Sequence, residues 1–174
     1  ISKYSNARPF PYNPVLVRFS QAYQFGTNIN GLNRFYEENF DEYNRSFGDI
    51  RKLAIRSSYM QVFQMFRIGR VGVFQQILKD QDGNDNLTIS DRLLNTIVYY
   101  VGDYGMNAPE SFGTNNYASY FNDNIRGIVG RLSLDGIEAI SILYKINSFA
   151  TAQLPLRTGN SKIYGVFNAQ TNRY

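Results

Sequence analysis

The side chains best suited to binding another molecule are the cations of one segment, RSFGDIRKLAIRSSYMQVFQMFRIGR, residues 45–70. If this segment is helical, at about 100° per residue, five cations fall within a stripe about 60° wide: Arg45, Lys52, Arg56, Arg67 and Arg70. Lysine and arginine both bind phosphate, and arginine adds a planar fork of donors. Asp49 is the only acid in the segment. The pattern predicts a contact with a polyanion, with a solvated ion-paired face or the acids of a neighbouring subunit as alternatives.

The composition excludes several classes of catalyst. The chain of 174 residues has no Cys and no His, which rules out disulfides, thiol nucleophiles, Cys/His zinc sites and histidine acid–base chemistry. It carries 18 basic and 14 acidic residues, a formal net charge of +4, and it is rich in Tyr and Phe. We therefore expect a protein that is not an enzyme and needs no cofactor.

Two acidic segments offer weaker alternatives. From Asp80, acids or amides stand at the first, third and fifth positions, and Asp91 stands at the twelfth, which resembles an EF-hand calcium loop. The sixth position is Asp85 instead of the usual Gly, so a polar turn is the competing interpretation. The cluster Glu37, Glu38, Asp41 and Glu42 has paired carboxylates, but it is typical of a soluble helix exterior.

The elements expected to position these side chains are helices. Apolar residues recur at three- and four-residue spacing along most of the chain, which predicts an all-α helical bundle. Asn13 and Pro14 have the pattern of a helix start, and Ser90 is suited to cap another helix. The expected helices cover about 13–26, 32–44, 49–79, 90–101, 117–132 and 134–154.

The two ends of the chain differ from the body in charge. Residues 1–14 carry Lys3, Arg8 and three prolines without an acid, which favours an extended basic arm. Residues 155–174 add three cations, again without an acid, and predict an irregular tail. We thus divide the chain into an N-terminal arm (1–14), a helical body (15–154) and a C-terminal tail (155–174), with no apolar run of membrane-spanning length.

Two stretches carry a resemblance to a known family. They are RFSQAY, residues 18–23, and YGMNAPESFGTNNYASYFNDNIRGIVGRLSLDGIEAISILYKINSF, residues 104–149. Their order of loop, aromatic helix, Arg-bearing turn and Tyr-containing helix resembles the major capsid proteins of rod-shaped and filamentous archaeal DNA viruses, the rudivirus, lipothrixvirus and tristromavirus group. The resemblance implies a helical bundle whose subunits pair as a homodimer or with a sister protein and wrap double-stranded DNA in A-form.

The leading expectation is a nucleocapsid subunit, located in the virion, that polymerises helically around double-stranded DNA. Phosphate contacts would come from the five cations of the stripe, from Lys3 and Arg8, and from Arg126 and Arg131. A basic scaffold or linker that joins acidic protein partners is the main alternative, and a calcium-binding helical module is a weaker one.

Overall fold

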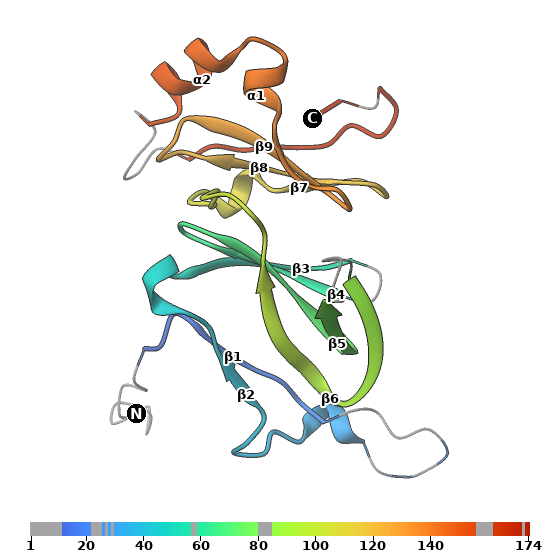
Figure 1. The fold of residues 1–174 in the computed structure, drawn as a ribbon. Coiled ribbons are helices and arrows are strands. Elements are labelled where there is room, and N and C mark those ends of the chain that lie inside the picture. The colour runs from blue at the N-terminus through green and yellow to red at the C-terminus, as the bar shows by residue number, and fades with distance from the viewer. Residues whose placement is uncertain are drawn as a thin grey trace, which may run out of the picture.

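Antiparallel β-sheets dominate the protein, contrary to the all-α expectation (Figure 1). The structure, a computed structural model, describes residues 12–21, 26, 28, 30–56, 59–79, 85–155, 162–171 and 173–174. The central sheet has the order β3-β4-β5-β6, with strands Ile50–Arg56, Tyr59–Gln64, Ile68–Lys79 and Asp85–Tyr99. A second sheet has the order β10-β9-β8-β7, with strands Gly136–Ala139, Ile128–Ser133, Ser119–Asp123 and Gly113–Thr114. A small ribbon pairs β1 (Leu16–Arg18) with β2 (Phe40–Glu42).

The long helix expected over residues 49–79 is wrong, because three strands of the central sheet occupy that range. Strand β3 alternates strictly between half-buried and exposed residues, which is the two-residue period of a strand with one covered face. The expected helices over 90–101 and 117–132 are also strands, β6 in the first case and β8 with β9 in the second. Strands β1 and β2 and one short 3₁₀ turn at residues 31–33 lie in the ranges of the two expected N-terminal helices.

Helix is confirmed only within part of the last expected span. The two α-helices of the described residues are α1 (Ile140–Leu143) and α2 (Asn147–Gln153), and β10 occupies the beginning of that span. Three 3₁₀ turns complete the assignment: η1 (Gly31–Asn33), η2 (Arg45–Phe47) and η3 (Pro109–Ser111). Neither α-helix is long enough to cross a bilayer, and no other helix of the described residues is.

The sheets stack in layers with an apolar core on each face of the central sheet. One core lies between the central sheet and the β1–β2 ribbon and contains Tyr43, Met60, Val62, Val71 and Leu94. The other core lies between the central and second sheets and contains Phe63, Ile68, Met106, Phe121 and Leu132. The α-helices lie beyond the second sheet, so the molecule is elongated in the direction of stacking (Figure 1).

The turn between β8 and β9 is fixed by a buried carboxylate. Asp123 is fully buried, and its Oδ1 accepts hydrogen bonds from the backbone N–H groups of Ile125 and Arg126 at 3.1 Å each. Its Oδ2 accepts from the N–H of Gly105, also at 3.1 Å. A buried carboxylate is costly unless its oxygens accept hydrogen bonds. These bonds therefore fix the position of the second sheet relative to the loop that precedes it.

Candidate functional site

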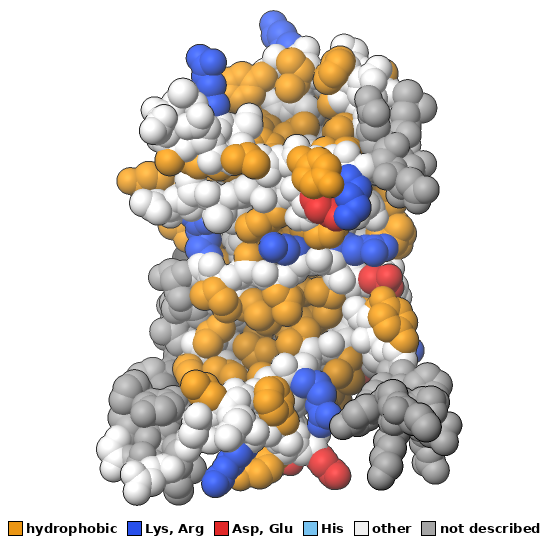
Figure 2. All heavy atoms as spheres, turned by 180° about the vertical axis from the view of Figure 1, so that it is seen from behind, with side chains coloured by type: hydrophobic (Ala, Val, Ile, Leu, Met, Phe, Trp, Pro, Cys, Tyr) orange, Lys and Arg blue, Asp and Glu red, His pale blue; other side chains and the backbone are white. Residues whose placement is uncertain are grey.

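Three cations of the predicted stripe share one face of the central sheet. Lys52 and Arg56 lie four residues apart on β3, so their side chains point to the same face. Arg70 of β5 is the cross-strand partner of Gln61 of β4, which points to this face as well. This is the face that packs against the second sheet, so these side chains lie at the margin between two layers. Figure 2 shows Lys and Arg side chains in a row across the waist of the molecule, with apolar side chains above and below.

Each of these three cations contacts the protein itself. The Lys52 Nζ lies 5.4 Å from the centre of the Phe112 ring, and the Arg70 guanidinium lies 5.5 Å from that of Tyr100. The Arg56 Nη1 donates at 3.4 Å to the hydroxyls of Thr114 and Ser119 in the second sheet. Arg56 therefore bridges the two sheets and Lys52 contacts the segment between η3 and β7, whereas the ring beside Arg70 directly follows β6 of the central sheet.

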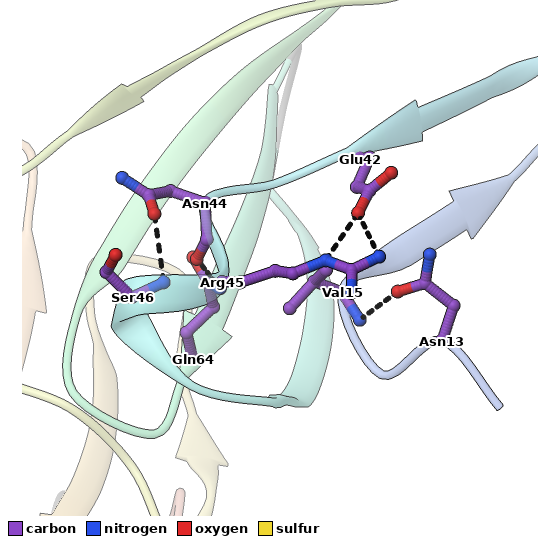
Figure 3. Close-up of polar contacts among 7 residues, drawn as sticks. All are labelled: Asn13, Val15, Glu42, Asn44, Arg45, Ser46 and Gln64. Atoms are coloured by element: carbon purple, nitrogen blue, oxygen red, sulfur yellow. Dashed lines mark hydrogen bonds and ion pairs between the residues drawn. The ribbon is translucent and has the colours of Figure 1, made fainter.

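The other two stripe residues lie in turns instead of on this face. Arg67 follows β4, with its guanidinium 5.0 Å from the Phe47 ring centre and 3.9 Å from Asp103. Arg45 extends from η2 toward β2, where its Nε donates to Glu42 at 2.7 Å (Figure 3). This hydrogen bond lowers the pKa of Glu42 below its ordinary value. The predicted stripe of five is thus three cations on one face of the central sheet and two cations in turns.

The two candidates near the C-terminal end are paired with acids. The Arg126 Nη1 donates to the buried Asp123 at 3.1 Å, which compensates the carboxylate charge. Arg131 of β9 forms an ion pair with Glu138, its direct cross-strand neighbour on β10. Both cations therefore stabilise the second sheet.

Two predicted sites cannot be placed. Lys3 and Arg8 lie outside the described residues, as do residues 80–84 of the proposed calcium loop. That loop joins β5 to β6, so its flanking elements are strands and not the helices of an EF-hand. Among the described residues, no three acids gather in a way that would hold a metal ion.

The acidic cluster predicted on a helix face is divided between a loop and a strand. Glu37 and Glu38 are exposed in the loop before β2, whereas Asp41 is on β2 and accepts from Arg92 at 2.6 Å. Burial raises the pKa of Asp41 against the opposing effect of Arg92. These carboxylates do not form a pair around a common point that would suit hydrolysis.

A cavity that the sequence did not indicate lies on the outer face of the second sheet. Its volume is about 630 Å³, and its floor contains Tyr120 and Asn122 of β8 and Val129 and Arg131 of β9. The cover consists of α1, the residues around α2 and the C-terminal segment after residue 162. The floor residues are spaced two apart on paired strands, a pattern that becomes visible only once the strands are known.

The cover is tied to η3 by its own contacts. The Lys162 Nζ donates to Glu110 at 2.6 Å, which lowers the pKa of Glu110 and raises that of Lys162. The Tyr174 hydroxyl donates to the carbonyl oxygen of Ser111, while burial raises the pKa of Tyr174 to about 12. The described residues of the expected C-terminal tail, 162–171 and 173–174, thus contribute to the cover of the cavity.

The sequence matches no protein-family model and no curated protein. The geometry of the chain itself is therefore the basis for inferring what the protein does.

Proposed function

We propose that this protein is a non-enzymatic structural subunit that associates head to tail with further copies of itself. The observation that carries the proposal is a pair of apolar surfaces at opposite ends of the molecule. The first, the helical patch, consists of Ile142, Leu143 and Phe149 on α1 and α2, exposed by 54%, 55% and 69%. The second, the loop patch, consists of Leu32, Phe35, Tyr36 and Phe40, exposed by 56%, 56%, 47% and 42%.

The positions of the two patches favour a repeating contact. Figure 1 shows α1 and α2 at one end of the stack and the segment from η1 to β2 at the other end. When two different surfaces of one chain bind each other, every added copy leaves one of each surface free. Such a contact produces a ring or an open filament instead of a closed dimer.

Both patches carry exposed charges at their margins. Glu37 and Glu38 are exposed between the aromatic residues of the loop patch, and Arg18 and Arg34 lie beside the same patch. Lys145 is exposed between α1 and α2 and has no acid within those helices. Opposite charges at the rim orient two surfaces whose apolar centres supply most of the affinity.

Wrapping of double-stranded DNA stays a prediction of the sequence. The described cations of the predicted set contact rings, hydroxyls or carboxylates within the chain. The geometry therefore supports assembly through protein contacts more directly than binding through the predicted phosphate ligands. Binding of double-stranded DNA would be recognised by an affinity that falls steeply as the salt concentration rises.

Mixing of two variants, each with one of the two patches disrupted, tests the head-to-tail contact. Phe35→Ser removes an aromatic ring from the loop patch, and Phe149→Ser removes one from the helical patch. Sedimentation velocity of the native protein should show species that grow with concentration. Each variant alone should be monomeric, whereas an equimolar mixture should form dimers and nothing larger, because only one intact patch of each kind remains.

The matched control is Val101→Ser, which removes an apolar side chain that is 93% exposed outside both patches. This variant should assemble like the native chain. Native protein that stays monomeric at all concentrations, or a mixture that sediments like its separate components, would rule out the proposal. Negative-stain microscopy would distinguish a ring from a filament.

A further inference from the structure

Strand β3 forms one edge of the central sheet, and most of its outer side is unpaired. The sheet has the order β3-β4-β5-β6, so β3 has a neighbouring strand on one side only. At its first residue, the N–H of Ile50 donates to the carbonyl oxygen of Pro14 at 3.0 Å. Among the described residues, no main-chain group outside the sheet bonds to residues 51–56. An edge of this kind is a template on which another chain can add a strand.

The register of the sheet shows which main-chain groups face outward. The N–H of Gln64 donates to the carbonyl oxygen of Arg67 at 2.9 Å, so the even-numbered residues of β4 hydrogen-bond to β5. Because the bonding side alternates along a strand, the odd-numbered residues of β4 bond to β3, where their partners carry even numbers. The N–H and C=O groups of Leu53 and Ile55 therefore point away from the sheet.

The same two residues place apolar side chains beside this edge. Leu53 and Ile55 are 38% and 70% exposed, and neither belongs to the core under the β1–β2 ribbon. Their cross-strand neighbours Val62 and Met60 do belong to it. Figure 2 shows apolar side chains below the row of cations. An added strand would cover this apolar surface and bond to the outward main-chain groups at the same time.

The other face of β3 carries positive charge that no ion pair within the described residues neutralises. Lys52 and Arg56 lie on that face and contact a ring and two hydroxyls instead of carboxylates. Of the three cations of β3, only Arg51 has an ion pair within the described residues, with Asp49 at 3.7 Å. The charge of β3 therefore favours an acidic partner.

A second copy of the chain is a poor candidate for the added strand. Two β3 strands that pair antiparallel about Ala54 would place Lys52 of each copy directly opposite Arg56 of the other. Like charges in opposite positions destabilise a sheet, and a shifted register still brings the cations of both strands together. The same charges thus oppose self-pairing and leave the edge available to a chain of opposite sign.

We propose that β3 binds an extended acidic segment of another protein as an additional antiparallel strand. Side chains directly opposite each other in such a pair share a face. The residues opposite Leu53 and Ile55 should thus be apolar, and those opposite Lys52 and Arg56 should be acidic. The segment has the pattern acidic, apolar, any residue, apolar, acidic. Main-chain bonds and apolar contacts supply the affinity and charge selects the partner, so neither cation has to leave its contacts within the chain.

Calorimetric titration with the capped peptide Ser-Glu-Val-Thr-Val-Glu-Ser tests this pattern. The titrated protein carries Phe35→Ser, which disrupts the loop patch, so the result does not depend on the head-to-tail contact and the two proposals can fail separately. The acidic peptide should bind. The peptide Ser-Lys-Val-Thr-Val-Lys-Ser should bind at least about tenfold more weakly, because its charges repel those of β3.

Two modified peptides distinguish an added strand from a general ionic contact. The two Val residues of the acidic peptide lie opposite Leu53 and Ile55, so their N–H groups should bond to β3, whereas the Thr N–H should point away. N-methylation of both Val residues should weaken binding by about tenfold or more, whereas N-methylation of Thr should change it by less than about threefold.

Variants of the protein test the same edge from the other side. Ile55→Pro removes an outward N–H without removing a bond of the sheet, and proline is tolerated at such positions, so it should weaken peptide binding about tenfold with little change in Tm. Ile55→Ser, which removes only the apolar contact, should weaken it several-fold, and the control Val101→Ser, outside β3, should bind as before. The proposal is overturned if the acidic peptide does not bind, if the lysine peptide binds equally well, if methylation at Val and at Thr has the same effect, or if Ile55→Pro reduces self-association of the native chain instead of peptide binding.

Discussion

Replacing Gly130 with Ala should change the free energy of unfolding in opposite directions in the sheet structure and in the helix that the sequence predicted. Gly130 lies on β9 and faces the core, opposite Phe121 of β8. A Cβ at this position would stand 2.4 Å from Cζ of Phe121 and 2.8 and 2.9 Å from two further ring atoms. Because the Phe121 ring is fully buried and packs edge-on against Phe63, it has little space to move.

The cost of this substitution follows from two opposing effects. Overpacking of a core by one methyl group costs about 1–3 kcal/mol. Replacing Gly with Ala within a strand returns roughly 0.5–1 kcal/mol through the lower entropy of the unfolded chain. The net loss should be about 1–2 kcal/mol, which for a chain of this size lowers the Tm by about 2–8 °C. In the helix that the sequence predicted over 117–132, the same change would raise the stability by about 1 kcal/mol.

Thermal and urea unfolding of Gly130→Ala measure this difference directly. Phe121→Leu should relieve part of the clash, so the double variant should be less destabilised than the sum of the two single variants by roughly 0.5–3 kcal/mol. An increase in the Tm of Gly130→Ala, or strict additivity in the double variant, would show that β8 and β9 do not pack as described.

Two further predictions concern the contacts between layers and the C-terminal cover. Arg56→Ala removes the bonds to Thr114 and Ser119 and should lower the free energy of unfolding by about 1–2 kcal/mol in urea denaturation; unchanged stability would show that Arg56 is not an interlayer contact. The pKa of Tyr174 is raised to about 12, so its neutral form stabilises the fold fully below the unfolded value of about 10, and this stabilisation is lost as the pH rises through 12. Burial also raises the pKa values of Tyr43 and Tyr100, so absorbance at 295 nm should show several late-ionising tyrosines, of which Tyr174→Phe should remove one. An unchanged titration in that variant would contradict the assignment.

The fold class could not be predicted from the spacing of apolar residues alone. Over residues 50–56 the sequence IRKLAIR does not alternate between apolar and polar residues, and the cations of residues 45–70 satisfy a helical period. The ambiguity arises because both faces of the central sheet are covered, so apolar residues occur on both. The Asp135–Gly136 pair, where the turn after β9 meets the first residue of β10, was a usable signal for a hairpin, and Gly136 has a positive φ of 119°.

The helical projection of the cations is wrong, because strands occupy residues 50–56, 59–64 and 68–79. Lys52, Arg56 and Arg70 share a face of the central sheet, whereas Arg45 and Arg67 lie in turns. Arg126 and Arg131 could not be identified as internal partners, because Asp123 and Glu138 become their neighbours only through a tight turn and a strand pairing. The cavity depends on three segments brought together by the fold, so no local pattern indicates it.

The location of the cations constrains where partners can bind. A cation between two sheets covers apolar surface with its stem and gives its charge to a ring or a hydroxyl, so another ligand must compete with that contact. Phosphate binding by Arg56, for example, would have to replace its bonds to the second sheet. The helical and loop patches carry no such cost, because their apolar side chains gain contacts only when another surface covers them. Partner binding at the two ends of the stack is therefore favoured over phosphate binding at its waist.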